Sequence, residues 1–234
     1  MSRKATYEAV SLTLRARCSL ESVTFIPADG VVTNVPGVEG AIESATSLAT
    51  GSSLTKDLVN SPPNILNPLS LASTAKKIAS ESSGCMKLKV MDAKECEAMG
   101  MGAYLGVARG SETEPQFIHL TYTPPKGKAA TKLAVVGKGL TFDAGGYNIK
   151  TAMMELMKFD MGGSAAVMGA AKAVSMLKPE NVEIHFIVAS CENMINEKAM
   201  RPGDILTASN GKTIEVRRST CFWKIDELLG YLPL

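Results

Sequence analysis

"GGSAAVMGAAKAVSML", residues 162–177, and "VEIHFIVASCEN", residues 182–193, decide the fold class. The first segment is a run of small residues, typical of a helix that packs closely on a sheet. The second is an almost continuous apolar run, which is the pattern of a strand that is buried on both faces. Together they predict a helix that leads directly into a central strand of an α/β fold.

The rest of the chain alternates between the same two kinds of pattern. Predicted helices span residues 40–60, 68–84 and 93–100, with Gly51 as a weak point in the first. Predicted strands span residues 86–92, 116–122 and 132–139. Residues 201–216 predict a hairpin that turns at "NGK". We therefore expect an α/β fold with a mixed, mostly parallel sheet that is flanked by helices.

The composition is that of a globular protein and excludes two classes of partner. Of the 234 residues, 45% are hydrophobic and 21% are charged. The net charge is only +2 and the basic residues form no stripe, so a nucleic-acid partner is not expected. No apolar run reaches the about 18 residues that a membrane-spanning helix needs, so a membrane partner is not expected either.

The cysteines bear on the compartment of the protein. Five of them, with no CxxC or Cys/His spacing, argue against a disulfide framework and against a zinc–thiolate site. Buried or free thiols fit a reducing compartment, and the cytoplasm is the simplest location. The N-terminal residues contain Arg3, Lys4, Arg15 and Arg17 among several Ser and Thr, which leaves a plastid transit peptide as the alternative.

The stretch "VVGKGLTFDAGGYNIK", residues 135–150, places charged side chains directly after a strand. Lys138, Asp143 and Lys150 lie in this glycine-rich segment, and Asp160 follows in "KFDMGGSAA". In α/β sheets, ligands bind beyond the carboxyl ends of the strands. Two aspartates that each precede a Gly-Gly pair predict a shared, oxygen-rich site for a divalent cation. A deprotonated lysine could join it as a ligand, while a charged lysine could stabilise an oxyanion.

Simpler interpretations stay open for each residue taken alone. A surface lysine or aspartate commonly contacts only water, and Asp160 could simply cap the helix that follows it. The two histidines, His119 and His185, lie in apolar strand patterns and are expected to be structural. Arg201 and Asp204 are expected to hold the turn before the hairpin.

Several motifs resemble those of the leucine aminopeptidase (cytosol aminopeptidase) family, in its plant-like form. They are "VGKGLTFDAGGYNIK", "MKFDMGGSAA" and "NMINEKAMRPGDILTASNGKTIEV", supported by "DLVNSPPNIL" and "MGAYLGVARGS". The resemblance runs from about residue 38 to Val216. It implies a remnant of an N-terminal domain over 1–37, a partial metallopeptidase catalytic domain over 38–216 and a divergent tail over 217–234.

The resemblance also implies a reaction and its residues. Members of the family release N-terminal residues, often leucine, from peptides, with two Mn²⁺ or Zn²⁺ ions that share a bridging water. By motif, Lys138, Asp143 and Asp160 would be metal ligands and Lys150 the catalytic electrophile. Met157 would line the pocket for the substrate side chain. Family members assemble as hexamers, so a homo-oligomer or a mixed oligomer with a full-length relative is expected.

The chain departs from the family pattern in two places. The family continues after "TIEV" with "NNTDAEGRLTLADAL", whereas here Thr220, Phe222 and Lys224 stand at the positions of an aspartate ligand, a glutamate ligand and the catalytic arginine. The segment "TAMMELMKF" is also shorter than the plant-type pattern, which carries a Gly-Pro-Gly piece. We therefore expect impaired activity, or alternatively an inactive subunit or binding module that associates with full-length relatives.

Overall fold

The computed structural model of the chain describes residues 37–217. Two compact units divide the chain, Met1–Glu39 and Gly40–Leu234, and the elements below belong to the second unit from Gly40 onward. Apart from Gly37 and Arg217, the expected N-terminal remnant and C-terminal tail lie outside the described residues. Among the described residues, no helix combines the length and apolar character needed to cross a membrane.

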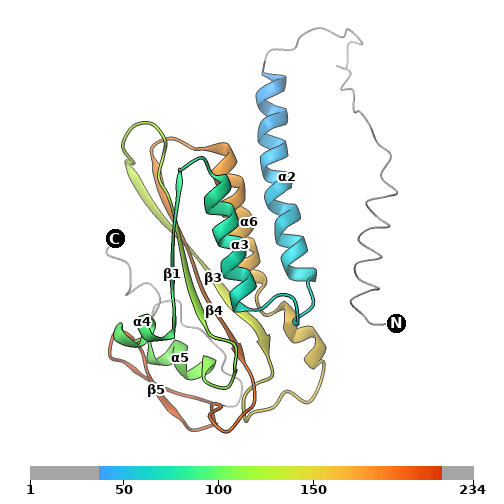
Figure 1. Cartoon of the computed structure of the whole chain (residues 1–234), viewed down its shortest axis with the longest axis vertical. Coiled ribbons are helices and arrows are strands. Elements are labelled where there is room, and N and C mark those ends of the chain that lie inside the picture. Colours follow the sequence, from blue (N-terminus) through green and yellow to red (C-terminus); the bar gives the residue numbers. More distant parts are fainter. Residues whose placement is uncertain (1–36, 218–234) are drawn as a thin grey trace. The chain divides into compact units, whose positions relative to one another are not determined.

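A four-stranded sheet with the order β1-β2-β4-β3 forms the centre of this unit (Figure 1). Its strands are β1 (Met86–Met91), β2 (Gln116–Tyr122), β3 (Thr131–Asp143) and β4 (Val182–Asn193). β3 and β4 run parallel, and the chain passes between them through a 3-10 helix, η1 (Met154–Phe159), and α6 (Gly162–Leu177). The other two pairings, β1 with β2 and β2 with β4, are antiparallel. The predicted α/β class with a mixed sheet flanked by helices is confirmed, while parallel pairing in the described sheet is limited to β3 with β4 and the sheet is not mostly parallel.

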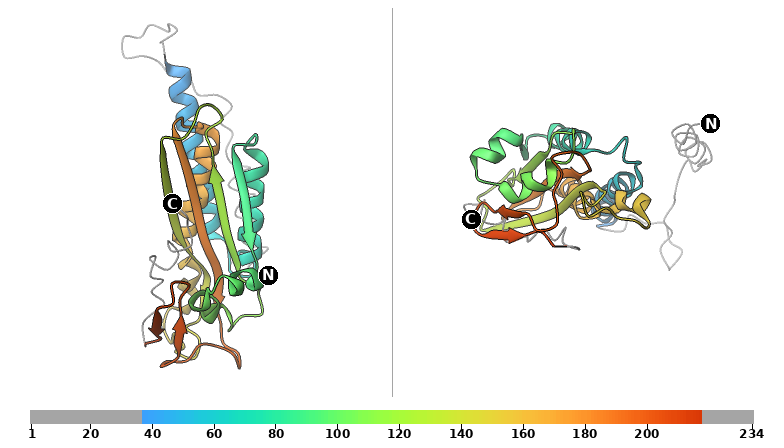
Figure 2. Two further views of the ribbon diagram at one scale, coloured as in Figure 1. Left: turned by 90° about the vertical axis from the view of Figure 1, so that its left-hand side faces the viewer. Right: turned by 90° about the horizontal axis from the view of Figure 1, so that it is seen from below.

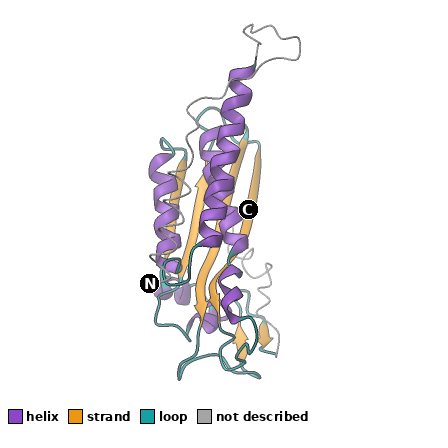
Figure 3. Ribbon diagram, turned by 90° about the vertical axis from the view of Figure 1, so that its right-hand side faces the viewer, coloured by secondary structure: helices purple, strands orange, loops and turns teal. Residues whose placement is uncertain are grey.

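Long helices cover one face of the sheet, as Figure 3 shows. They are α2 (Val38–Asn60), α3 (Pro68–Glu81) and α6. Alternate residues of the strands, such as Ile118 and Phe186, enter a core with apolar residues of these helices. This alternation follows from strand geometry, in which successive side chains point to opposite faces.

The second face of the sheet carries two short helices near one end (Figure 2). These are α4 (Ala93–Ala98) and α5 (Gly102–Ala108), and they enclose a second core with Phe117, Ile187 and Leu140. The hairpin of β5 (Ile205–Thr207) and β6 (Thr213–Glu215) pairs antiparallel, as predicted. Helices therefore lie on both faces, and β4 is buried from both sides.

The sequence accounts for the helix ends, but Gly51 corrects one expectation. Asn67 caps α3 ahead of Pro68, and its side chain accepts a hydrogen bond from the N–H of Ser70 at 3.0 Å. Gly51, expected as a weak point, lies inside an unbroken helix. A Cβ atom on Gly51 would lie 2.5 Å from the carbonyl oxygen of Gly169 in α6. The glycine is thus the contact point between two helices and not a break.

Candidate metal centre

A bulge in β3 brings Lys138 and Asp143 to one face of the sheet. Lys138 lies beside Ala189, and Asp143 lies beside Asn193, but the register shifts between Leu140 and Phe142. Without this extra residue, two positions five apart on a strand would point to opposite faces. The bulge at Thr141 therefore allows both side chains to project from the same side of the strand.

Two lysine–aspartate ion pairs form along this part of the chain. Nζ of Lys138 lies 2.6 Å from Oδ1 of Asp160, and both side chains are partly exposed. Nζ of Lys150 lies 3.0 Å from Oδ2 of Asp143. The four residues that the sequence singled out are thus joined in two pairs of opposite charge.

Asp143 is fully buried, and its two carboxylate oxygens have different surroundings. Oδ1 accepts hydrogen bonds from Nδ2 of Asn193 at 2.7 Å and from the N–H of Gly145 at 3.0 Å. Oδ2 accepts no hydrogen bond from the described residues, although Lys150 is its ion-pair partner. Burying a carboxylate costs several kcal/mol unless it is paired and hydrogen-bonded, and these three neighbours offset that cost.

Asp160 follows η1, the helix that carries Met157. Its N–H donates to the carbonyl oxygen of Met157 at 3.4 Å, and Met157 itself is half-buried. Asp160 lies one residue before Met161, the N-cap of α6, which has no side-chain cap. Asp160 is therefore held by the end of η1 and by Lys138, and its simpler interpretation as the N-cap of α6 is wrong.

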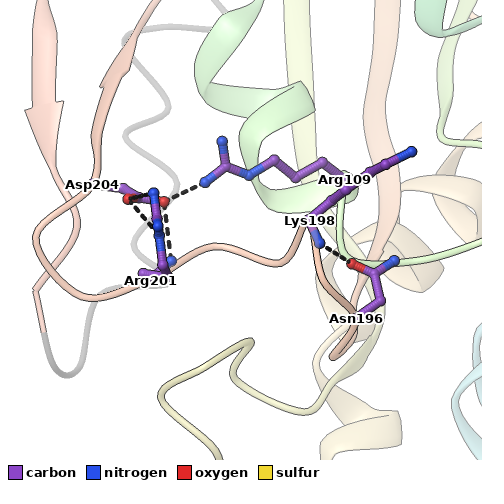
Figure 4. Close-up of polar contacts among 5 residues, drawn as sticks. All are labelled: Arg109, Asn196, Lys198, Arg201 and Asp204. Atoms are coloured by element: carbon purple, nitrogen blue, oxygen red, sulfur yellow. Dashed lines mark hydrogen bonds and ion pairs between the residues drawn. The ribbon is translucent and has the colours of Figure 1, made fainter.

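A neighbouring loop supports the turn between Asp143 and Lys150. The N–H of Tyr147 donates to the carbonyl oxygen of Met200 at 3.0 Å. One residue further on, Arg201 binds Asp204 through its backbone N–H at 3.1 Å and its Nε at 3.2 Å, and Arg109 forms an ion pair with the same carboxylate (Figure 4). The backbone hydrogen bond from Arg201, followed by the charges of both arginines, lowers the pKa of Asp204. The structural role expected for Arg201 and Asp204 is confirmed.

The histidines form a hydrogen-bonded chain on the sheet. Nε2 of His119 lies 2.9 Å from Nδ1 of His185, whose Nε2 lies 3.1 Å from Oε1 of Glu183. Burial, followed by the charges of His185 and Lys89, lowers the pKa of His119 to about 4. Both imidazoles are engaged with neighbours, as the structural interpretation predicts.

Asp143 and Asp160 are the two carboxylates of this region that could ligate a divalent cation. Carboxylate oxygens are ligands for Mn²⁺ and acceptable ligands for Zn²⁺. The buried Oδ2 of Asp143 accepts no hydrogen bond from the described residues, so a cation bound there would displace its ion pair with the Nζ of Lys150 at 3.0 Å. Across residues 37–217, no three side chains of His, Cys, Asp or Glu lie close enough together to hold a metal ion. A cation here would depend on two carboxylates with an amine, a weaker set than a closed site has.

Comparison with known proteins assigns this arrangement to a family. The model of the cytosol aminopeptidase family, catalytic domain, matches residues 53–220. The chain belongs to the cytosol aminopeptidase family. The resemblance noted in its motifs is confirmed.

Three relatives show how much of a cytosol aminopeptidase this chain represents. Leucine aminopeptidase 2, chloroplastic, of Oryza sativa subsp. japonica is 57% identical over 187 residues, which are 79% of this chain and 31% of the relative. A probable cytosol aminopeptidase of Synechococcus sp. is 53% identical over 203 residues, 86% of this chain and 39% of the relative. A solved structure of a tomato leucine aminopeptidase mutant has a TM-score of 0.72 at 51% identity, covering 80% of this chain and 35% of the other. The chain therefore spans about a third of the length of these relatives.

Within this cytosol aminopeptidase segment, one polar residue near the ion pairs was not anticipated. Asn193 ends the buried strand β4 and touches Asp143 directly. The one feature of the sequence that points to Asn193 is its position at the carboxyl end of a predicted strand, where ligands bind in α/β sheets. Thr220, Phe222 and Lys224, which the family resemblance places at further site positions, lie outside the described residues.

Proposed function

We propose that the chain is a metal-dependent aminopeptidase that releases N-terminal residues of leucine type from peptides. The observation that carries this proposal is the pairing of Lys138 with Asp160 and of Lys150 with Asp143, from motifs that match the family's site. Asp143 and Asp160, with Lys138, would hold Mn²⁺ or Zn²⁺. When bound, such an ion supplies Lewis acidity and a water of lowered pKa.

Lys150 has the electrophilic role in this proposal. Its Nζ is partly exposed and lies 3.0 Å from the buried carboxylate of Asp143, which supports its remaining charged. A charged amine beside the reacting carbonyl would stabilise the negative oxygen that develops when the peptide bond is attacked. Met157, half-buried on η1, would contact the substrate side chain.

We further propose that turnover is low. At the positions where the family has an aspartate, a glutamate and an arginine, this chain has Thr220, Phe222 and Lys224, which offer no carboxylate or guanidinium. Two divalent ions about 3.5–4 Å apart repel each other strongly and need several anionic ligands. Only Asp143 and Asp160 are available for this among the motif residues, so one cation is better supported than two.

The same substitutions favour a second candidate function. The chain would then be a non-catalytic subunit or binding module that assembles with full-length relatives. Co-purification with such a relative, unaffected by added metal, supports this candidate, and a monodisperse monomer that binds no relative contradicts it. Homo-oligomerisation, up to a hexamer, is proposed for the catalytic alternative on the same family grounds.

The compartment also remains a proposal. The cytoplasm was the simplest expectation, while plant relatives such as those of Oryza sativa and Solanum lycopersicum are named chloroplastic, which supports the plastid. Immunodetection of the native protein in separated plastid and cytosolic fractions distinguishes the two.

The proposed function is tested by measuring metal binding and hydrolysis on one sample. Calorimetric titration with Mn²⁺ gives the stoichiometry, and hydrolysis of a leucyl-anilide with and without chelator gives the metal-dependent turnover. Slow turnover that chelation abolishes supports the aminopeptidase. Metal binding without turnover favours the non-catalytic subunit.

A further inference from the structure

Asn193 contacts the candidate metal centre through both its side chain and its backbone. Its Nδ2 donates to Oδ1 of Asp143 at 2.7 Å, and its carbonyl oxygen accepts the N–H of Ala144 at 2.8 Å. The residue is fully buried at the last position of β4. Asn193 therefore binds the carboxylate and the first residue of the turn that leads to Lys150.

The turn itself is built closely around Asn193. A Cβ atom on Gly146 would lie 3.2 Å from Oδ1 of Asn193 and 2.9 Å from the carbonyl oxygen of Met200. Gly146 also has a φ of +60°, which glycine adopts at little cost. The backbone at Gly146 thus leaves little space for a side chain beside the amide of Asn193.

The two carboxylate oxygens of Asp143 have different partners. Both hydrogen-bond donors, Asn193 and Gly145, bind Oδ1, whereas Oδ2 points to the Nζ of Lys150. A carboxylate with one oxygen held in this way cannot rotate freely, and its other oxygen keeps one direction. Groups that orient a ligand by hydrogen bonding raise metal affinity, because the ligand need not be ordered when the metal binds.

We propose that Asn193 is a positioning residue that fixes Asp143 so that Oδ2 binds a divalent cation in place of the Lys150 ammonium. The inference rests on the proposed function, since it assumes that Asp143 is a metal ligand. Asn193 itself touches neither the cation nor the peptide in this scheme and acts through Asp143. Replacing it weakens metal binding only where the Asp143 carboxylate is present.

The test is calorimetric titration with Mn²⁺ on the full chain and its variants. Asn193→Ala is expected to weaken Mn²⁺ binding about 10- to 100-fold, the usual effect of removing a partner of a ligand. Asn193→Leu fills nearly the same volume without a donor and gives the same answer if the alanine variant does not fold. Asn196→Ala is the matched control, because Asn196 lies in the following loop and its side chain accepts the N–H of Lys198 at 2.8 Å.

A double variant separates positioning from a general structural effect. In the Asp143→Ala background, Asn193→Ala is expected to cause no further loss of Mn²⁺ affinity. Folded Asn193 variants that bind Mn²⁺ as the wild type does, while Asp143→Ala binds it more weakly, overturn this inference and leave the metal site intact. Equal Mn²⁺ binding by the wild type and Asp143→Ala removes the proposed metal site, and the inference with it.

Discussion

Gly51 of α2 and Gly169 of α6 lie against each other at the crossing of the two helices. A Cβ atom on Gly169 would lie 2.0 Å from Oγ1 of Thr55 and 2.5 Å from the carbonyl oxygen of Gly51. Thr55 also donates a hydrogen bond to the carbonyl oxygen of Ala165 at 3.2 Å, which links the two helices. Small residues at this crossing let the backbones approach and hold α2 to the catalytic-domain sheet through α6.

Gly51→Ala is expected to destabilise the protein, although alanine is the better helix former. The new methyl group overlaps the backbone of α6, and such overpacking costs roughly 1–3 kcal/mol. Gly40→Ala is the matched control, because a Cβ there meets no atom within 4 Å and the substitution should stabilise α2 by about 0.5–1 kcal/mol. Urea denaturation measures the free energy of unfolding of both variants, which should fall for Gly51→Ala and rise for Gly40→Ala. Equal changes would contradict close contact between α2 and α6 at Gly51.

The low pKa of His119 predicts a pH dependence of folding. Its pKa is about 4 in the folded protein and 6.5 when unperturbed, so the unfolded chain binds a proton first as the pH falls. The contribution of His119 to the free energy of unfolding is therefore fully present above pH 6.5. It is lost progressively as the pH falls towards 4, with a slope of at most about 1.4 kcal/mol per pH unit. Because the ring is only half-buried, a slope of roughly half that value is expected.

Replacing His119 should flatten this dependence. His119→Gln keeps a donor near His185 but cannot bind a proton, so its unfolding free energy should change less between pH 6.5 and 5 than that of the wild type. Lys87→Gln changes an exposed residue on β1 that does not titrate in this range, and it should follow the wild-type profile. Parallel profiles for the wild type and His119→Gln would show that His119 is not the titrating group.

Met153 adopts a left-handed backbone conformation in the segment between Lys150 and η1. Its φ is +51° and the residue is 65% exposed, so little packing offsets the cost of this conformation. Met153→Gly is expected to stabilise the protein by about 0.5–1 kcal/mol. Met154→Gly, in η1 at the next position, should destabilise it, and a thermal melt of both variants distinguishes them.

Lys150→Ala should reduce any metal-dependent hydrolysis of a leucyl substrate about 10²- to 10³-fold, because a donor to the developing oxyanion is removed. Lys132→Ala is the control, since Lys132 forms only a surface ion pair with Glu183 at 3.5 Å. Steady-state kinetics with equal metal loading checks the difference. Unchanged turnover in Lys150→Ala would rule out the electrophilic role.

Much of the fold could be predicted because its central elements carry strong patterns. The apolar run that ends at Asn193 and the small-residue helix before it could each be assigned from composition and length. α5 could not, since "GAYLGVA" contains two glycines and has little intrinsic helix preference. It is held by tertiary contacts instead, including the hydrogen bond from Tyr104 to the carbonyl oxygen of Ser190 at 2.7 Å and the packing of Gly106 on Leu206.

The charged residues of the candidate site could be singled out in the sequence, whereas the bulge and the amide that position them could not. Lys138, Asp143, Lys150 and Asp160 stand in glycine-rich motifs, which mark them in the sequence. The bulge at Thr141 leaves no such mark, although the five-residue spacing from Lys138 to Asp143 requires an extra residue if both are to share a face. Asn193 likewise carries no distinguishing pattern in the sequence, because its contact with Asp143 depends on the pairing of β3 with β4.

Calorimetric titration of the folded chain with Mn²⁺, together with leucyl-anilide hydrolysis on the same sample, tests the proposed metal centre most directly. One bound ion is expected, with weaker binding in Asp143→Ala and in Asp160→Ala, together with slow hydrolysis that a chelator abolishes. Absence of Mn²⁺ binding, or an Mn²⁺ affinity that is unchanged in both variants, would contradict the proposed metal centre.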